Sequence, residues 1–368
     1  MQQFLSRLFS TTGGRIGVGA VLALIITAIA VLSTGGGGED TETVADPTPT
    51  AGPTAEPTAT PEPEATPEPT PTPEPETLSP LNGLPVTDEV AARRVLGVKI
   101  DNAPEARPQS GIEAADVMVE IWVEGITRFL ALWQEADTDF VGPIRSMRPT
   151  DFAILNAMEA TFVNSGGQGF VQAIGNASNV EYFQEPAGSF RVAGRFAPHN
   201  LYGDTEPLRE LDSRGPRYDE ALEPLWNFDE MPADAADVTT ITTNWPQGYV
   251  VSWEWNGEAW ERFTLGTPHE WVSQDGATRE QVTAETLVML EMSIQSVGGG
   301  SGSAVPESVT TGSGTAWVFA DGKVQEGTWA REVDTEWFTL TTADGAEMAV
   351  PPGRQWLILP QPGGVVFE

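Results

Sequence analysis

The chain has 368 residues, with 53 acidic and 19 basic side chains and a formal net charge of -34. It has no cysteine, which excludes disulfides, cysteine-based zinc sites, iron–sulfur clusters, thiol nucleophiles and a lipid anchor on cysteine. The acidic balance excludes nucleic acid as a partner, because phosphate contacts need a basic face.

An uncharged apolar run, residues 16–32, follows Arg7 and Arg15. Its length lies at the short end of the roughly 17–25 residues that cross a bilayer as a helix. The positive flank predicts a cytoplasmic N-terminus with the following chain outside the membrane. Residues 1–33 are therefore interpreted as a signal anchor that binds the membrane through residues 16–32. A cleaved signal peptide is the alternative.

Residues 34–77 consist mainly of proline, threonine and glutamate after a run of glycines. Such a segment buries too little apolar surface to offset the entropy of ordering, so we expect a disordered stalk. Frequent proline favours extended polyproline II, at about 3.1 Å per residue. The stalk is expected to hold a folded region away from the membrane.

The first folded region is predicted at residues 78–230. Apolar runs predict strands at 95–100, 117–123, 128–133 and 161–163. Residues 150–158 have helical spacing after Pro149, and Thr150 is the expected N-cap. Strands covered by helices predict a layered α/β domain.

Arginine, acid and amide side chains gather at the ends of these predicted strands. Guanidinium groups match carboxylates and phosphates in geometry, so several arginines at one sheet edge predict an anion-binding pocket. Internal arginine–carboxylate pairing that fixes loops to the sheet is the competing interpretation. The candidate ligand-binding residues are Asp101, Asn102, Arg107, Gln109, Ser110, Glu120, Glu124, Thr127, Arg128, Arg145, Ser146, Arg148, Ser165, His199 and Asn200.

Catalytic residues cannot be assigned from the sequence. No Gly-x-Ser-x-Gly motif is present, and a catalytic base for serine chemistry has to be His199 or His269. His199 is the better candidate, with Asn200 able to orient it; His269 is expected to be structural. Two isolated histidines and the absence of an EF-hand pattern give no basis for a metal site, and no cofactor is predicted.

Several ordered motifs of this region resemble the YerB-like proteins, bacterial envelope lipoproteins with a domain of unknown function. The matching stretches are Asp101-Asn102, residues 106–111, Ala115-Asp116, residues 123–128, residues 142–146, residues 165–167 and residues 197–201. The resemblance covers about residues 78–365. It implies an N-terminal α/β domain, a smaller β-rich C-terminal domain and an extracytoplasmic location, and it supplies no established reaction.

The sequence departs from the family pattern in two ways. Many members are anchored through a lipidated cysteine, which this chain lacks, so the run at residues 16–32 is expected to replace that anchor. Members commonly have Glu-Gly-Gly where Glu124 and Gly125 are followed directly by Ile126. This second difference is expected to reshape the turn.

The second folded region, residues 235–368, is predicted to be β-rich. Alternating apolar residues flank Asn256-Gly257, Asp321-Gly322 and Asp344-Gly345, which are typical hairpin turns. Residues 286–294 are expected to form one long strand, and 356–359 a last one. Three hairpins predict a meander or a small sandwich. Six tryptophans are predicted to belong mainly to the core, with a sugar-stacking platform as the alternative; they are Trp253, Trp255, Trp260, Trp271, Trp317 and Trp329.

The sequence thus predicts an α+β protein: a layered α/β domain and a smaller antiparallel β domain behind an anchor and a stalk. Three functions remain open. The first is a non-catalytic envelope module that binds a cell-wall component or a partner protein through the Arg/Glu-rich surface. The second is an envelope hydrolase or transferase that uses the same arginine and glutamate side chains with His199. The third is a structural spacer.

Overall fold

The computed structural model describes residues 77–217, 220–298 and 302–368. The described part is mostly β-sheet, with four short α-helices: α1 (Asp88–Ala91), α2 (Pro149–Leu155), α3 (Gly169–Ala177) and α4 (Thr205–Arg209). Short 3-10 helices occur at Pro104–Ala106, Ile112–Ala114, Asn156–Met158 and Pro246–Gly248. No helix of these described ranges is long and apolar enough to cross a membrane. The predicted anchor lies outside the described residues, as does the stalk except for Thr77.

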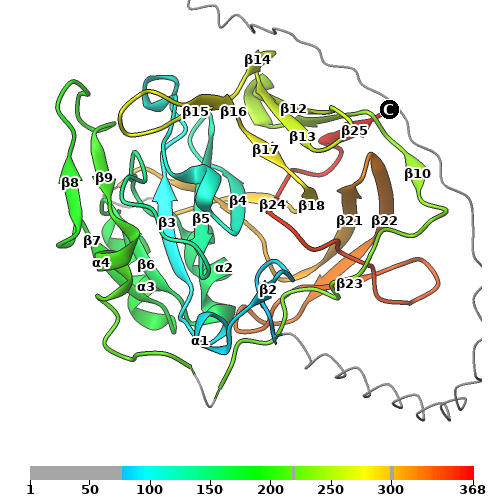
Figure 1. Cartoon of the computed structure of the whole chain (residues 1–368), viewed down its shortest axis with the longest axis horizontal. Helices are drawn as coiled ribbons and strands as arrows, with labels where there is room; N and C mark the ends of the chain where they lie inside the picture. The colour runs from blue at the N-terminus through cyan, green and yellow to red at the C-terminus, as the bar shows by residue number, and fades with distance from the viewer. Residues whose placement is uncertain (1–76, 218–219, 299–301) are drawn as a thin grey trace, which may run out of the picture. The chain divides into compact units, whose positions relative to one another are not determined.

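One eleven-stranded mixed sheet contains strands from both predicted folded regions. Its order is β10 (Ala236–Asp237), β22 (Lys323–Arg331), β21 (Gly312–Ala320), β18 (Thr286–Leu290), β24 (Gln355–Ile358), β4 (Val117–Trp122), β5 (Thr127–Trp133), β3 (Leu96–Ile100), β6 (Thr161–Asn164) and β7 (Glu181–Gln184), with β23 (Thr339–Thr341) on β22. β24 lies between β18 and β4, parallel to both (Figure 1). The strands that the second folded region contributes here therefore do not form a separate sheet, because β24 pairs directly with β4 of the first region.

A six-stranded antiparallel sheet belongs to the second folded region. It consists of β14 (Thr267–Pro268), β13 (Trp260–Thr264), β12 (Val250–Trp255), β11 (Thr240–Asn244) and β25 (Val365–Phe367), with β17 (Thr283–Ala284) on β13. Four two-stranded sheets pair β1 (Thr77–Leu78) with β2 (Pro85–Val86), β8 (Ser189–Arg191) with β9 (Leu201–Gly203), β15 (Glu270–Val272) with β16 (Arg279–Gln281), and β19 (Ile294–Val297) with β20 (Val305–Ser308).

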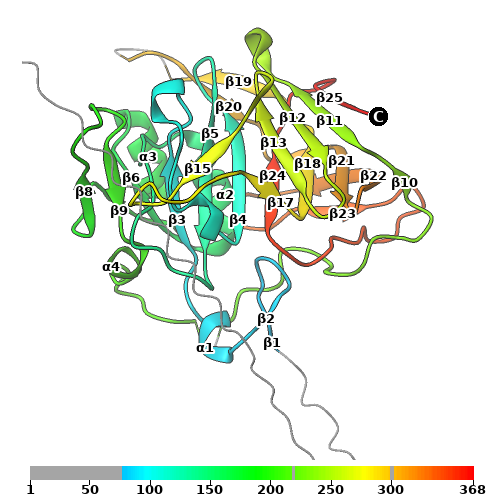
Figure 2. The same cartoon turned by 45° about the horizontal axis from the view of Figure 1, so that its top comes forward.

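Both faces of the large sheet are buried. On one face, residues such as Leu130 and Leu357 pack against Phe152 and Leu155 of α2 and Val171 of α3. On the other face, side chains of β4, β5 and β24 pack against the six-stranded sheet, whose strands β11, β12 and β13 are labelled in Figure 2. Because successive side chains of a strand point to opposite faces, each central strand contributes to both cores.

Most predicted strands are present within a residue or two of their expected limits. The hairpins at Asn256-Gly257 and Asp321-Gly322 are confirmed as β12–β13 and β21–β22. At Asp344-Gly345 the pairing is reduced to a bridge between Thr341 and Glu347.

Two local predictions are wrong. The expected strand 286–294 ends at Leu290, because Met292 N bonds Pro360 O and the chain then leaves the sheet to pair β19 with β20. Thr150 does not cap α2. It accepts a hydrogen bond from Ser308 N, while Asp151 accepts one from Arg148 N at the start of the helix.

Candidate functional site

The candidate residues gather where β3 ends, around Asp101 and Asn102. Asp101 N bonds Pro143 O and Arg145 N bonds Lys99 O, so the loop with Arg145 lies along the end of β3. The side chains of Asp101 and Asn102 bond to two different sets of residues. Asn102 belongs to a buried polar network, whereas Asp101 belongs to a cluster of arginines that reaches the surface.

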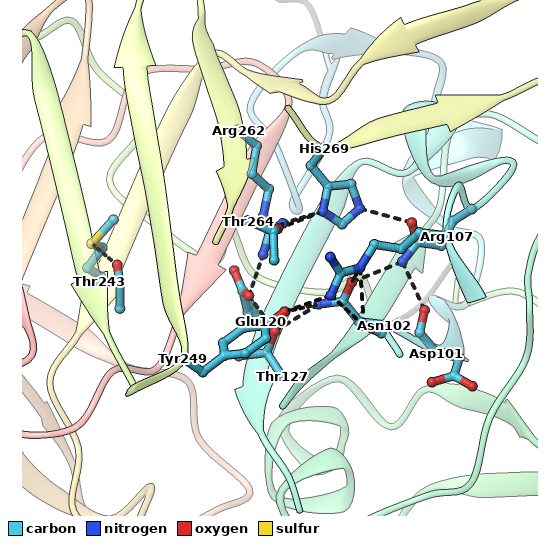
Figure 3. Close-up of polar contacts among 12 residues, drawn as sticks. Asp101, Asn102, Arg107, Glu120, Thr127, Thr243, Tyr249, Arg262, Thr264 and His269 are labelled. Atoms are coloured by element: carbon cyan, nitrogen blue, oxygen red, sulfur yellow. Dashed lines mark hydrogen bonds and ion pairs between the residues drawn. The ribbon is translucent and has the colours of Figure 1, made fainter. Parts of the chain in front are cut away.

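The buried network joins the two folded regions (Figure 3). We define it by Asn102, Gln109, Glu120, Thr127, Arg262 and His269, all of which are buried. Thr127 Oγ1 donates to Glu120 Oε1 at 2.7 Å, and Asn102 Nδ2 donates to Thr127 Oγ1 at 2.9 Å. Gln109 Nε2 donates to Asn102 Oδ1 at 3.2 Å, and His269 Nε2 bonds Gln109 Oε1 at 2.9 Å.

Arg262 closes this ring of hydrogen bonds. Its guanidinium donates to Glu120 Oε1, to Thr264 Oγ1 and to His269 Nδ1. The same group lies over the rings of Phe129, Trp253 and Trp356, at 5.1, 5.8 and 5.2 Å from the ring centroids. Arg262 and Glu120 are both fully buried, and their ion pair connects β13 with β4. Such an enclosed pair holds two elements in register and leaves no access for a ligand.

His269 is fixed in one neutral tautomer by its partners. Arg262 can only donate, so His269 Nδ1 is the acceptor and Nε2 carries the hydrogen. Burial lowers the pKa of His269 well below its usual value, and the charges of Arg262 and Arg107 lower it further. The expectation that this histidine is structural agrees with its complete enclosure.

Acidification is expected to destabilise the fold through His269. A histidine whose pKa is lowered in the folded state contributes stability above its unfolded pKa of about 6.5, and loses it as pH falls below that value. Between pH 7 and 5 the free energy of unfolding should fall by about 2 kcal/mol from this group alone. Urea unfolding followed by tryptophan fluorescence measures the loss.

His269→Gln removes the titrating group and keeps a donor and an acceptor, so its pH dependence should be flatter than that of the wild type. His199→Gln serves as the matched control, because His199 is the other of the chain's two histidines and, unlike His269, its side chain is partly exposed. Equal slopes for the wild type and His269→Gln would show that His269 is not held neutral.

The arginine cluster lies on the other side of Asp101. We define it by Asp101, Glu124, Arg128, Arg145, Arg148 and His199. Asp101 Oδ2 lies 2.8 Å from His199 Nδ1 and 3.1 Å from Arg145 Nε. Arg148 makes a two-pronged ion pair with Glu124, with both N–O distances at 2.8 Å. Arg145 and His199 are partly exposed, with 24% and 19% of their side-chain surface accessible, so this cluster meets solvent.

Arg128 differs from the other arginines of this cluster. It is 7% exposed, and its one hydrogen bond within the described ranges runs from Nη1 to Ser146 O at 3.2 Å. Its buried Nε has no partner there, and no carboxylate of the described part lies within 4.0 Å. Burial lowers the pKa of Arg128 to about 10, and the neighbouring Arg148 contributes to this lowering. Arg128 thus remains a cation at neutral pH without a counter-ion in contact.

A second buried ion pair lies close to this cluster. Lys99 Nζ donates to Asp151 Oδ1 at 2.6 Å, and both side chains are fully buried. Burial lowers the pKa of Lys99 to about 8, and the charges of Arg128 and Arg148 lower it further. Lys99 is therefore enclosed and paired, whereas Arg128 is nearly buried and has no carboxylate in contact within the described ranges.

Other candidate residues have structural or separate roles. Arg107 donates to Asn102 O and to the hydroxyl of Tyr249, so it belongs beside the buried network. Asn200 does not orient His199: its Oδ1 accepts from Arg191, and Asp101 holds the histidine instead. Ser110 is buried, and the hydroxyls of Ser146 and Ser165 lie 3.5 Å apart. Of the six tryptophans, four are buried in the core, namely Trp253, Trp260, Trp317 and Trp329.

Sequence reasoning missed Arg262, Tyr249, Lys99 and Asp151. A signal for Arg262 was available, because residues 260, 262 and 264 alternate as the inward side of a predicted strand. An arginine in such a position has to be paired. Nothing in the sequence indicated that its partner is Glu120.

The described part also contains pockets away from the arginine cluster. One, of about 850 Å³, lies beside Trp226, Trp337 and Glu347, and another, of about 440 Å³, lies beside Trp122 and Pro246. No group of three or more histidine or acidic side chains in the described ranges is arranged to hold a metal ion.

Comparison with known proteins identifies relatives of both folded regions. Residues 81–217 match the model of the N-terminal domain, and residues 240–357 that of the C-terminal domain, of "Protein of unknown function (DUF3048)". The chain is 26% identical over 290 residues to a Bacillus subtilis (strain 168) protein named "Putative lipoprotein YerB", covering 76% of this chain and 85% of that protein.

The crystal structure of YerB from Bacillus subtilis has a similar fold. It superposes with a TM-score of 0.66 at 22% identity and covers 80% of this chain and all of the YerB chain. The two matched domains correspond to the two folded regions that share the large sheet here. The chain therefore belongs to the DUF3048 family, with both its N-terminal and its C-terminal domain.

Proposed function

We propose that this chain is a membrane-tethered, extracytoplasmic protein of the cell envelope that binds an anionic group of a cell-wall component or partner protein without catalysing a reaction. The relative named as a lipoprotein supports this location, as do the apolar run at residues 16–32 and the proline-rich stalk. Residues 16–32 take the role that a lipidated cysteine has in other members.

The observation that carries the binding proposal is the unpaired charge of Arg128. A nearly buried cation without a carboxylate in contact is costly, and a bound anion removes that cost. Arg145 and His199 lie beside the same surface and share a single carboxylate oxygen of Asp101. A carboxylate or phosphate group entering here gains charge-assisted hydrogen bonds from guanidinium donors.

Arg128→Gln is expected to weaken anion binding by about tenfold or more, because a hydrogen bond to a charged group contributes roughly 1.5–3 kcal/mol. The full chain is titrated with inorganic phosphate by calorimetry and sedimented with purified peptidoglycan. Arg279→Gln is the matched control, because it removes an equal charge from an exposed pair with Glu270 on β15 and β16. Equal phosphate affinities for all three proteins would contradict the anion site; equal absence of sedimentation would remove peptidoglycan as the ligand.

A hydrolase or transferase is the second candidate, and the Asp101–His199 pair favours it. His199 Nδ1 bonds the carboxylate, and Nε2 has no hydrogen-bond partner in the described ranges, as in a general base. No serine hydroxyl of those ranges bonds His199, so no nucleophile is in place. A rate of 4-nitrophenyl acetate hydrolysis that His199→Gln abolishes, with phosphate binding retained, would favour this candidate.

A further inference from the structure

Phe196 is an aromatic side chain held in solvent beside the arginine cluster. It is 87% exposed, whereas the next most exposed large apolar side chain in the described ranges, Val366, is 58% exposed. Leaving a phenylalanine in water forgoes the free energy of its burial. Aromatic side chains in such positions are enriched in the centres of protein–protein interfaces.

The backbone that carries Phe196 is fixed on both sides. Before it, Arg195 donates to Ala106 O at 2.9 Å and to Pro108 O at 2.6 Å, and its guanidinium lies over the ring of Tyr202. After it, His199 N donates to Phe196 O at 2.9 Å, and the imidazole bonds Asp101. The exposure of Phe196 is therefore built into the turn, and the backbone loses little further entropy on binding a partner.

The same turn joins Phe196 to the arginine cluster. His199 closes the turn and shares Asp101 Oδ2 with Arg145. Arg128 lies within this group, because it donates to the backbone oxygen of Ser146, the residue after Arg145, and it has no carboxylate in contact in the described part. The exposed ring of Phe196 is thus joined through His199 and Asp101 to the arginine cluster, whose partly exposed members are Arg145 and His199.

We propose that Phe196 and the arginine cluster form a docking surface for an acidic peptide segment of a partner protein, with an apolar residue next to a carboxylate. The proposal rests on the proposed function in one respect, namely that the cluster accepts an anion. The basic groups of the cluster would bind the carboxylate of the peptide, and the exposed ring of Phe196 would contact its apolar residue. An anionic membrane is disfavoured, because it requires several free basic side chains around the apolar one. Both arginines beside Phe196 are engaged: Arg191 pairs with Glu185, and Arg195 bonds backbone carbonyls.

An array of random ten-residue peptides, probed with the full chain, tests the proposal. For the wild type we expect enrichment of Asp or Glu adjacent to a large apolar residue. Phe196→Ser should lose the apolar preference and keep the acidic one, whereas Arg128→Gln should lose the acidic one. Leu265→Ser, which removes another exposed apolar side chain, should behave as the wild type.

The outcomes separate the two proposals. Absence of acidic enrichment in the wild type, with phosphate binding retained, would overturn the docking surface alone, whereas absence of both would overturn both proposals. Acidic enrichment that Phe196→Ser leaves unchanged in every respect would overturn the docking surface alone. For the best peptide, fluorescence anisotropy should show at least about tenfold weaker binding by Phe196→Ser, from the apolar area lost, with unchanged phosphate affinity. Phe196-dependent binding to anionic phospholipid vesicles without peptide enrichment would assign the surface to a membrane and overturn the peptide proposal.

Discussion

Replacing Arg262 with methionine is expected to lower the free energy of unfolding by about 3–5 kcal/mol. The substitution keeps most of the apolar stem, and removes the cation that pairs with Glu120 in a fully enclosed site. Glu120 then keeps Thr127 as its one hydrogen-bond donor in the described part, and its Oε2 already has none. An uncompensated buried carboxylate carries the cost. Chemical unfolding of the full chain followed by tryptophan fluorescence measures it.

The double variant Arg262→Met, Glu120→Leu should recover a large part of that loss, because replacing both members of a buried ion pair removes the stranded charge. Arg279→Met is the control: this arginine pairs with Glu270 in an exposed position, where the expected cost is below about 1 kcal/mol. A double variant less stable than Arg262→Met would show that the cost arises from lost packing against Phe129, Trp253 and Trp356 instead.

A chain that ends at Pro351 is expected to lose cooperative folding in both family domains. The removed segment includes β24, the shared strand between β18 and β4. The segment also contains four core residues that are each 1% exposed or less, namely Trp356, Leu357, Ile358 and Leu359. Burying each contributes about 1.5–3 kcal/mol. The sum is comparable to the roughly 5–15 kcal/mol that stabilises a typical domain.

A chain that ends at Gln361 is the control for this truncation. It keeps β24 and lacks β25, the strand at the edge of the six-stranded sheet. We expect a single unfolding transition at lower denaturant concentration than for the full chain. Retention of a protected N-terminal domain in hydrogen exchange after removal of β24 would refute the shared-strand interpretation.

The sequence predicted the local elements of this fold well. β3, β4 and β5 follow from runs of apolar residues, and the hairpins β12–β13 and β21–β22 follow from their Asn-Gly and Asp-Gly turns. The place of β24 was not predictable. Its apolar run is compatible with any central position in a sheet, and its neighbours β4 and β18 are set by packing between distant segments.

The candidate site was predicted as one set of residues, and the structure divides it in two. Asp101 and Asn102 are consecutive, yet one bonds His199 and the other Thr127. Internal pairing therefore describes the residues of the buried network, whereas the arginine cluster remains a candidate for ligand binding. Asn102, Glu120 and Thr127 are engaged inside the protein, while Arg128 retains an unpaired charge in the described part. Residue types alone gave no means of separating them.

The position of β24 also determines when the fold can form. Val117 of β4 pairs with Gln355, so the large sheet stays incomplete until residue 355 has left the ribosome. Such distant pairing makes folding slow, because the long intervening chain must be ordered first. During this interval the backbone N–H and C=O groups that β4 and β18 later pair with β24 are free to pair with other chains. Production of this protein is therefore expected to depend on chaperones that cover the nascent strands until β24 has been synthesised.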